Sequence, residues 1–294
     1  MSRAGKTRRE VKMKLRMCNI TAVLLLVSVV FAAEQTNRSQ PKTTPEQTEV
    51  PAKIEDVNSL VDKANFTAYY QGQDGKARVK MTITDKQGRQ RGSEFIILRK
   101  DVKDGGDQKY YVYFHRPADV RGMVYIVHKH AGLDKDDDRW LYLPALDLVR
   151  RIAAGDKRTS FVGSDFLYED VSGRSPELDI HELIETTDKF FLLKNVPKRP
   201  DAVEFSYYNV TIDPNTYMPM KMEYYDKQGK LYRIIESKKV EKVKGFPTTV
   251  KSVALDLRTG SKTEMEFTNV DYNVNLKDIF TERYLRRPPR EARR

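Results

Sequence analysis

The chain of 294 residues has almost no cysteine and few turn-forming residues. Its single cysteine, Cys18, excludes a disulfide framework and any zinc site that needs two thiolates. Glycine and proline, with 15 and 13 residues, are too few for a collagen-like or low-complexity chain. Hydrophobic residues make up 39% of the chain, which is too apolar for a wholly disordered protein.

The body of the chain also lacks excess charge, although the net charge is +11. Residues 1–32 hold seven Lys and Arg against Glu10, and residues 283–294 hold six Arg against Glu291. The residues between these ends are balanced, so the folded body has no net basic excess with which to bind nucleic acid. We expect residues 283–294 to be a disordered basic tail, which either contacts anionic lipid headgroups or is an inert solubilising tail.

No uncharged run reaches the roughly 20 residues that span a bilayer. The run over residues 20–33 is shorter, follows a basic stretch and ends in small residues. This order is typical of a secretory signal, so we expect residues 1–32 to be a signal peptide cleaved after Ala32, with an uncleaved anchor as the alternative. Cleavage would remove Cys18. An exported chain without disulfides indicates the bacterial periplasm.

Residues 33–52 are polar and predict a flexible linker to a domain over residues 53–282. Apolar side chains on one helical face predict a short helix over residues 54–64. Strand patterns then follow at short intervals, which favours a sandwich or barrel. The expected strands cover residues 79–84, 93–99, 109–114, 123–128, 140–143, 202–212, 218–225, 231–237, 248–256 and 262–274.

Three of the apolar runs have no polar face: residues 110–114, 140–143 and 190–193. In a sheet with one solvated face, apolar and polar residues would alternate along each strand. These strands therefore need a cover on both faces, from helices, a partner or an apolar ligand. One face of an expected strand carries three methionines, Met218, Met220 and Met222. We expect their side chains either to fill the core or to form a deformable lining for a lipid.

Residues 138–170 carry the most distinctive pattern in the chain. It comprises Arg139-Trp140-Leu141-Tyr142-Leu143-Pro144, Arg150-Arg151-Ile152, Ser160-Phe161, Gly163-Ser164-Asp165-Phe166 and Tyr168-Glu169-Asp170. This pattern resembles the LolA-like outer membrane lipoprotein-sorting protein family, and the likeness extends over about residues 50–282. The resemblance implies a mainly β (α+β) fold, a half-open antiparallel β-barrel covered by a few helices. It also implies an apolar cavity between sheet and helices, and a periplasmic carrier of lipids or lipoproteins.

We expect the ligand-binding side chains to be aromatic, leucine and methionine residues near this pattern and on the methionine-bearing strand. They are Met123, Tyr125, Trp140, Tyr142, Leu143, Phe161, Phe166, Tyr168, Met220 and Met222. Arg150 and Arg151 are candidates for the cavity rim, where guanidinium groups would match a lipid phosphate. The alternative is an ion-pair cluster of these arginines with Asp165, Glu169 and Asp170 that fixes a loop.

Catalytic and metal motifs are weak. His128 and His130 form at most half a metal site. Asp134, Asp136 and Asp138 resemble a calcium loop, but Arg139 stands where that loop needs glycine. No P-loop, dinucleotide fingerprint, HExxH or Gly-x-Ser-x-Gly pattern occurs in the sequence. We therefore expect no metal, no cofactor and no enzymatic activity.

Two main hypotheses about function remain, and a third, an enzyme acting on a lipid, is kept only because serine and histidine residues are present. The first is a monomeric periplasmic carrier that holds a lipid or the acyl chains of a lipoprotein for transfer toward the outer membrane. Its expected partners are the cargo and an inner-membrane exporter, with transient membrane contact. The second is a non-transporting scaffold or accessory subunit of an exporter that uses its free sheet edge. A cavity of several hundred Å³ would favour the first, and a filled core the second.

Overall fold

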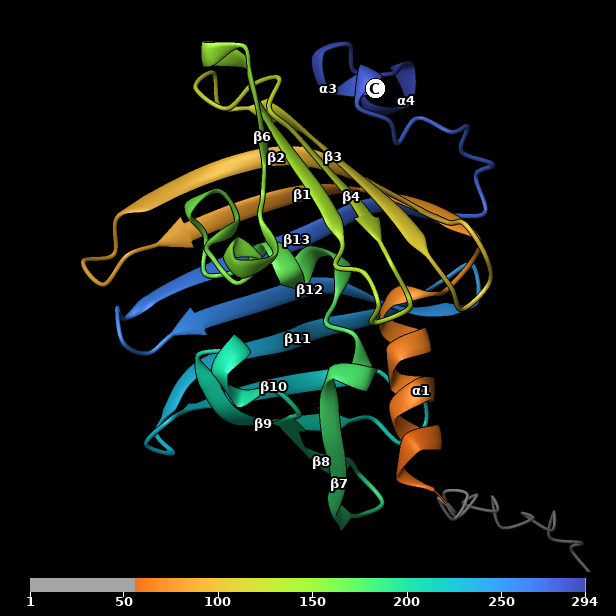
Figure 1. Ribbon diagram of the computed structural model, residues 1–294, viewed down its shortest axis with the longest axis vertical. Helices are drawn as coiled ribbons and strands as arrows, with labels where there is room; N and C mark the ends of the chain where they lie inside the picture. The colour runs from red at the N-terminus through yellow and green to blue at the C-terminus, as the bar shows by residue number, and fades with distance from the viewer. Residues whose placement is uncertain (1–55, 294) are drawn as a thin grey trace, which may run out of the picture. The chain divides into compact units, whose positions relative to one another are not determined.

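In the computed structural model, which describes residues 56–293, the strands pair into a single antiparallel sheet (Figure 1). The thirteen strands are β1 (Asp74–Thr84), β2 (Gln90–Asp101), β3 (Gln108–Arg116), β4 (Val124–Lys129), β5 (Asp138–Leu143), β6 (Leu148–Arg151), β7 (Asp179–Thr186), β8 (Phe191–Pro197), β9 (Phe205–Ile212), β10 (Pro219–Asp226), β11 (Leu231–Val243), β12 (Phe246–Asp256) and β13 (Ser261–Tyr272). The expected signal peptide and linker lie outside the described residues.

The strand order is β6-β5-β4-β3-β2-β1-β13-β12-β11-β10-β9-β8-β7, and β6 and β7 are the two edges, so the sheet is not closed. The predicted half-open antiparallel fold is confirmed. The two Asp-Lys-Gln-Gly turns share their chemistry, as their sequences indicate. In each, the aspartate (Asp85 or Asp226) accepts two backbone N–H bonds, at 2.9 to 3.0 Å.

The helices are few and short. They are α1 (Val57–Tyr69), α2 (Tyr168–Ser172), α3 (Arg283–Arg286) and α4 (Arg290–Arg293), with 3₁₀ turns η1 (Pro144–Leu146), η2 (Ala154–Asp156), η3 (Phe161–Gly163), η4 (Pro176–Leu178) and η5 (Pro200–Ala202). Asp56 caps α1 by accepting bonds from two backbone N–H groups at 3.2 Å. Within residues 56–293, no helix combines the length and apolar character needed to cross a bilayer.

One face of the sheet, the inner face, is covered by α1 and by residues 152–178, which we call the inner segment. Ile152, Phe161, Phe166 and Tyr168 of the inner segment are buried in the same apolar cluster as the inward side chains of the sheet. Gly173 has a φ of +79°, and a Cβ there would lie 2.6 Å from the Tyr69 ring. A glycine is therefore required where the inner segment meets α1.

The opposite, outer face of β2–β5 has its own cover, residues 274–293, which we call the outer segment. Its apolar side chains form a second buried cluster with the outward residues of these strands. Along β3, for example, Tyr110 and Val112 belong to the inner cluster and Tyr111 to the outer one. Chain covering both faces thus explains the two-sided apolar runs over residues 110–114 and 140–143.

The outer segment corrects the expectation of a disordered tail. Residues 283–293 form α3 and α4, and Leu285 and Ala292 are almost fully buried against the sheet. The buried Asp74 carboxylate accepts the backbone N–H groups of Val274 and Leu276, each at 2.6 Å, where the outer segment begins. The arginine-rich composition concealed the few apolar residues that hold this segment.

Removing one of these apolar side chains tests the outer cover. Leu285→Ala should lower the free energy of unfolding by about 2–5 kcal/mol, because it deletes a fully buried side chain. Leu257→Ala, at a position that is 48% exposed, is the matched control and should change it by less than about 0.5 kcal/mol. Urea unfolding measures both, and equal effects would show that the outer segment does not pack as described.

Candidate functional site

A cavity of about 410 Å³ lies between the inner face of the sheet, α1 and the inner segment. Its lining is largely apolar. The sheet contributes Phe95, Ile97, Val112, Leu193, Val210, Ile212, Met222, Ile235, Met265 and Phe267, α1 contributes Val61, Ala64 and Ala68, and the inner segment contributes Phe161, Phe166 and Val171. The cavity reaches the surface, because Ala68 and Lys76 line it and are exposed.

The carboxyl end of α1 is fixed beside this opening by polar contacts. The Arg99 guanidinium donates to the backbone carbonyls of Gln71 and Gly72, at 2.7 and 2.5 Å. The Gln71 side chain, which lines the cavity, donates to the carbonyl of Pro247 in β12 at 2.6 Å. Strands β2 and β12 therefore hold the end of the helix from two directions.

Three of the predicted ligand-binding residues, Phe161, Phe166 and Met222, line the cavity. A second group lies behind them in the inner cluster. These residues are Met123, Tyr125, Leu143 and Tyr168. The rings of Tyr125 and Tyr168 lie 5.6 Å from the Phe161 ring, so they support the cavity wall without lining it.

Trp140, Tyr142 and Met220 were predicted to line the cavity and do not. Trp140 and Tyr142 point to the outer face, where they pack against the outer cluster. Met220 falls at a β-bulge, because Pro219 pairs with Ile212 and Lys221 with Thr211. The bulge takes Met220 out of the shared parity of Met218 and Met222, both of which line the cavity.

Arg150 and Arg151 lie on the edge strand β6 and are absent from the cavity lining, which corrects their predicted place at its rim. Arg150 is 3.6 Å from Asp156. Arg151 pairs with Asp138, and its guanidinium lies over the Trp140 ring on the outer face. Neither Arg150 nor Arg151 pairs with Glu169 or Asp170. These two carboxylates instead pair with Arg158, Arg174 and Arg233.

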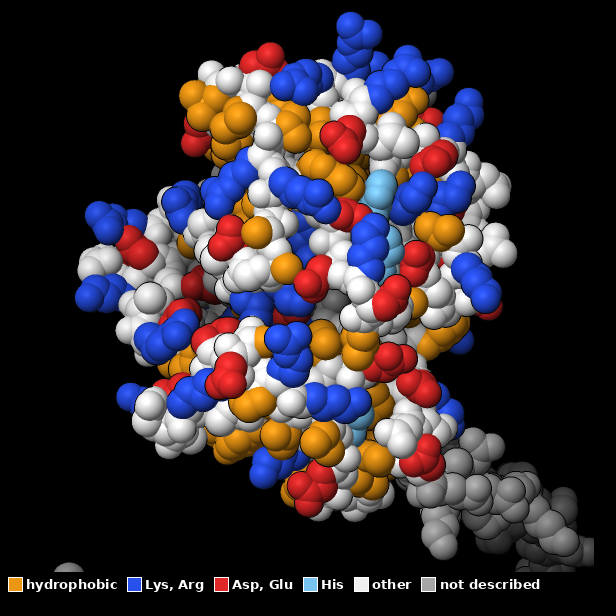
Figure 2. Space-filling view, in the orientation of Figure 1, with side chains coloured by type: hydrophobic (Ala, Val, Ile, Leu, Met, Phe, Trp, Pro, Cys, Tyr) orange, Lys and Arg blue, Asp and Glu red, His pale blue; other side chains and the backbone are white. Residues whose placement is uncertain are grey.

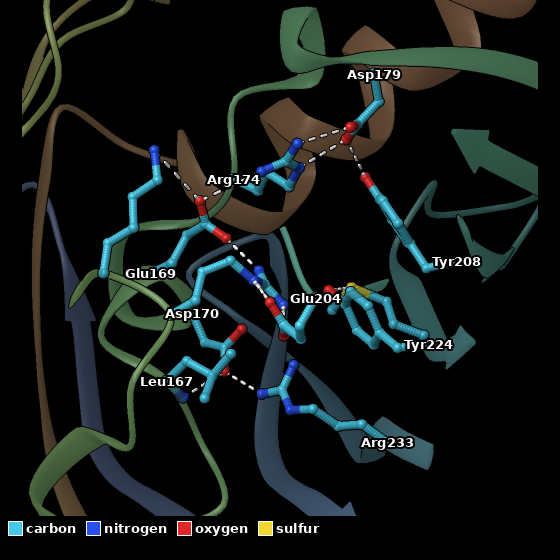
Figure 3. Close-up of polar contacts among 12 residues, drawn as sticks. Leu167, Glu169, Asp170, Arg174, Asp179, Glu204, Tyr208, Tyr224 and Arg233 are labelled. Atoms are coloured by element: carbon cyan, nitrogen blue, oxygen red, sulfur yellow. Dashed lines mark hydrogen bonds and ion pairs between the residues drawn. The ribbon is translucent and has the colours of Figure 1, made fainter. Parts of the chain in front are cut away.

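The charged groups beside the cavity form a network centred on the buried Glu169 of α2 (Figure 3). The Glu169 carboxylate pairs with Arg158, lies 3.5 Å from Arg174, and lies 3.9 Å from Lys157. Arg158 also donates two bonds of 2.7 Å to Glu204, just before β9. The inner segment is thereby joined to the β7–β9 part of the sheet.

Two further pairs complete the network. Arg174 donates two bonds of 2.8 Å to Asp179, at the start of β7, and the Tyr208 hydroxyl donates to the same carboxylate at 2.8 Å. Asp170 pairs with Arg233 of β11, a side chain that is only 3% exposed. Glu169, Asp170, Arg174 and Tyr208 line the cavity, so its wall is both apolar and charged.

The network shifts the pKa values of its members. Burial alone would raise the pKa of the Glu204 carboxyl, but the hydrogen bonds and charge of Arg158 outweigh burial and lower this pKa to about 2. Burial opposes ionisation of Glu169 as well, and the charges of Arg158, Arg174 and Lys157 lower its pKa. Both carboxylates are therefore ionised at neutral pH, and the network is built from charged groups.

Sequence reasoning missed Arg158, Arg174, Glu204 and Arg233. Arg233 did carry a signal, because it shares strand parity with the apolar Ile235 and so points to the covered face. Arg158 and Glu204 are 46 positions apart in the chain, and no local pattern joins them. Gly163, within the sequence pattern over residues 138–170, has a positive φ of 74°, a conformation that favours glycine.

The histidines make contacts within the fold. His130 lies 3.3 Å from Asp107 and 3.2 Å from Asp138, and the Nε2 atom of His128 lies 2.5 Å from the Phe280 carbonyl. In the part of the chain that the structure describes, no group of three or more His, Cys, Asp or Glu side chains is placed to hold a metal ion.

Comparison with known proteins places the chain in a family. Residues 106–287 match a family model with the description "-like: Uncharacterized protein". A DUF1329 family protein from Desulfovibrio piger ATCC 29098, with a crystal structure, is 30% identical, and the alignment covers 78% of this chain and 98% of that one with a TM-score of 0.72. The chain belongs to the DUF1329 family. No curated protein matches this DUF1329 chain.

Two other crystal structures share the fold. A domain from Vibrio parahaemolyticus, described as an outer membrane lipoprotein-sorting protein domain, is 24% identical with a TM-score of 0.71 over 78% of this chain and 97% of that one. A LolA superfamily protein from Nitrosomonas europaea is 16% identical with a TM-score of 0.59 over 78% and 98%. The LolA-like resemblance predicted from residues 138–170 is confirmed, and the shared fold covers 78% of this chain.

The Asp170–Arg233 pair of this DUF1329 protein can be tested by a double-mutant cycle. Asp170→Ala should cost about 3–5 kcal/mol of unfolding free energy, because it leaves a buried guanidinium without its counter-charge. The double variant Asp170→Ala, Arg233→Met should cost less than the sum of the two single changes. Arg89→Ala, in the exposed pair with Asp85, is the control, with an expected cost below about 1 kcal/mol. Additive effects in urea unfolding would contradict the pairing.

Acid should weaken the network. The folded pKa of Glu204 lies near 2, below its unfolded value, so its contribution to stability is present above about pH 4.5 and is lost as the pH falls toward 2. Urea unfolding between pH 7 and pH 2.5 should show a falling free energy of unfolding, and Glu204→Gln should show a shallower fall. Glu185→Gln, on the exposed end of β7, should follow the wild-type curve. A Glu204→Gln curve as steep as the wild type would rule out this role.

Proposed function

We propose that this protein is a periplasmic carrier that binds a lipid, or an acyl chain of a lipoprotein, in the cavity under α1 and the inner segment. The observation that carries the proposal is an apolar cavity of about 410 Å³ that opens to the surface. A methylene group occupies about as much space as a water molecule, roughly 30 Å³, so the cavity accommodates a chain of about a dozen carbons. Burial of each methylene contributes about 0.8 kcal/mol.

The chemistry of the lining supports a bound chain more than a catalysed reaction. Aromatic, leucine, valine and methionine side chains dominate it, and methionine adapts to cargo of variable shape. Among the charged groups at its wall, Glu169 is paired with Arg174, and Asp170 is paired with Arg233 of β11. They serve to position the inner segment, and we assign them no catalytic role.

The family likeness supports the location and the class of cargo. The Vibrio parahaemolyticus domain with this fold is described as sorting outer membrane lipoproteins. Export through the signal peptide expected over residues 1–32 would bring the carrier to the same compartment. An inner-membrane exporter as the donor and the outer membrane as the destination complete the proposal.

The rival proposal is a scaffold that pairs through a free edge of the sheet, β6 or β7. Both edges are available for pairing with another chain. A scaffold has no need of an unfilled apolar space, and for this reason the cavity favours the carrier. The two proposals differ in one measurable property, which is binding of an acyl chain by the isolated protein.

Filling the cavity opening should weaken binding without unfolding the protein. Ala68 is exposed on α1 and lines the cavity, so Ala68→Trp should obstruct it. Loss of two methylene contacts, at about 0.8 kcal/mol each, corresponds to roughly tenfold weaker binding of a fluorescent fatty acid. Ser59→Trp, exposed on the same helix and away from the lining, is the control and should bind as the wild type does.

Native mass spectrometry of protein purified from a periplasm provides the complementary measurement. A stoichiometric adduct that extracts into solvent as a lipid, and that is lost in Ala68→Trp but retained in Ser59→Trp, is the expected result. Protein that carries no adduct and takes up no fluorescent probe would favour the scaffold.

A further inference from the structure

Basic side chains are gathered at one end of the structure (Figure 2). Those of residues 283–293 in the outer segment are arginines, and they lie beside two exposed leucines. We call this surface the arginine tip. It consists of Arg283, Arg286, Arg287, Arg290 and Arg293 of the outer segment, with Leu146 and Leu148. All five arginines are exposed, and the leucines are 70% and 46% exposed. Leu146 is the most exposed large hydrophobic side chain within the described residues.

The arginines are displayed by a folded platform. Leu285 and Ala292 are buried on the outer face, and the Tyr111 hydroxyl donates to the Tyr284 carbonyl at 2.8 Å. Among the described residues, no acidic group lies within ion-pair distance of Arg287 or Arg290. Their charges are therefore available to a ligand outside the protein.

The leucines are fixed next to these arginines. Asp147, which separates Leu146 from Leu148, has a left-handed backbone with a φ of 43°. Its carboxylate accepts a bond of 2.8 Å from the Arg286 Nε atom, and its carbonyl accepts one of 3.1 Å from Nη2. Arg286 thus ties the leucine turn to α3, and the apolar and basic groups form one surface.

We propose that the arginine tip docks on the surface of an anionic phospholipid bilayer. Exposed leucines on a short turn enter the boundary between headgroups and acyl chains, and the neighbouring guanidinium groups bind lipid phosphates, which they match bidentately. Charge complementarity favours this occupant, because residues 283–293 of the outer segment contain five arginines and only one acidic residue, Glu291. The proposal does not rest on the cargo of the cavity, whose lining contains none of these residues.

Vesicle flotation tests the docking. The full chain should float with vesicles of phosphatidylcholine and phosphatidylglycerol, and far less with phosphatidylcholine alone. Each basic residue near an anionic membrane contributes about fivefold in partitioning, so Arg287→Gln with Arg290→Gln should weaken binding by roughly 30-fold at low salt. Leu146→Ser with Leu148→Ser should also weaken it. The expected loss should shrink as salt is added.

Matched controls remove basic and leucine side chains elsewhere on the surface. Lys86→Gln with Lys189→Gln removes two exposed charges at other turns, and Leu257→Ser removes an exposed leucine. Both should float as the wild type does. Equal binding to neutral and anionic vesicles, or full binding by the Arg287→Gln, Arg290→Gln protein, would overturn the proposal. Uptake of the fluorescent fatty acid should stay unchanged in every tip variant, so failure of docking and failure of the carrier function are distinguishable.

Discussion

The position of the inner segment depends on the charge network around Glu169. Toward β2–β5 this segment is held by aromatic packing, as in the contacts of Phe161 with Tyr125 and Phe95. Toward β7–β11 the inner segment borders the cavity, which also extends under β2 and β3. The pairs Arg158–Glu204, Arg174–Asp179 and Asp170–Arg233 connect it to the sheet on that side. Ion pairs around the cavity thus allow an apolar space to persist under a fixed cover.

The sheet divides into a part with cover on both faces and a part with cover on one. On β2–β5 the outer segment supplies the second cover, and the strands carry apolar residues of both parities. On β10 and β12 the outward residues are more polar, as with Lys221 and Lys251. We therefore expect stability to be concentrated in the doubly covered part. The cavity borders both parts, because Ile97 of β2 and Val112 of β3 line it together with residues of β8–β13.

Much of the fold could be predicted from sequence, and the site only in part. Most strands could be predicted from the local alternation of apolar and polar residues. The need for a cover on both faces could be predicted because residues 110–114 are apolar or aromatic on both sides of the strand. The sequence of a strand does not indicate which of its two sets of alternating side chains faces the cavity. Trp140 and Tyr142 were for this reason assigned to the wrong face. The bulge at Met220 shifts parity without a glycine to mark it. The pairing of Arg158 with Glu204 depends on how the inner segment crosses the sheet, which a sequence pattern does not record.

The arginine tip and α1 lie at opposite ends of β4. Val124, the first residue of this strand, pairs with Tyr142 just before the leucine turn, and Lys129, its last, lies over the rings of Tyr69 and Tyr70 at the end of α1. Burial lowers the pKa of the Lys129 amine to about 8. A protein docked through the tip would hold α1 and the cavity opening away from the bilayer. Cargo would then reach the cavity from the aqueous side, by way of a donor protein, and the tip would serve to orient the carrier rather than to extract lipid.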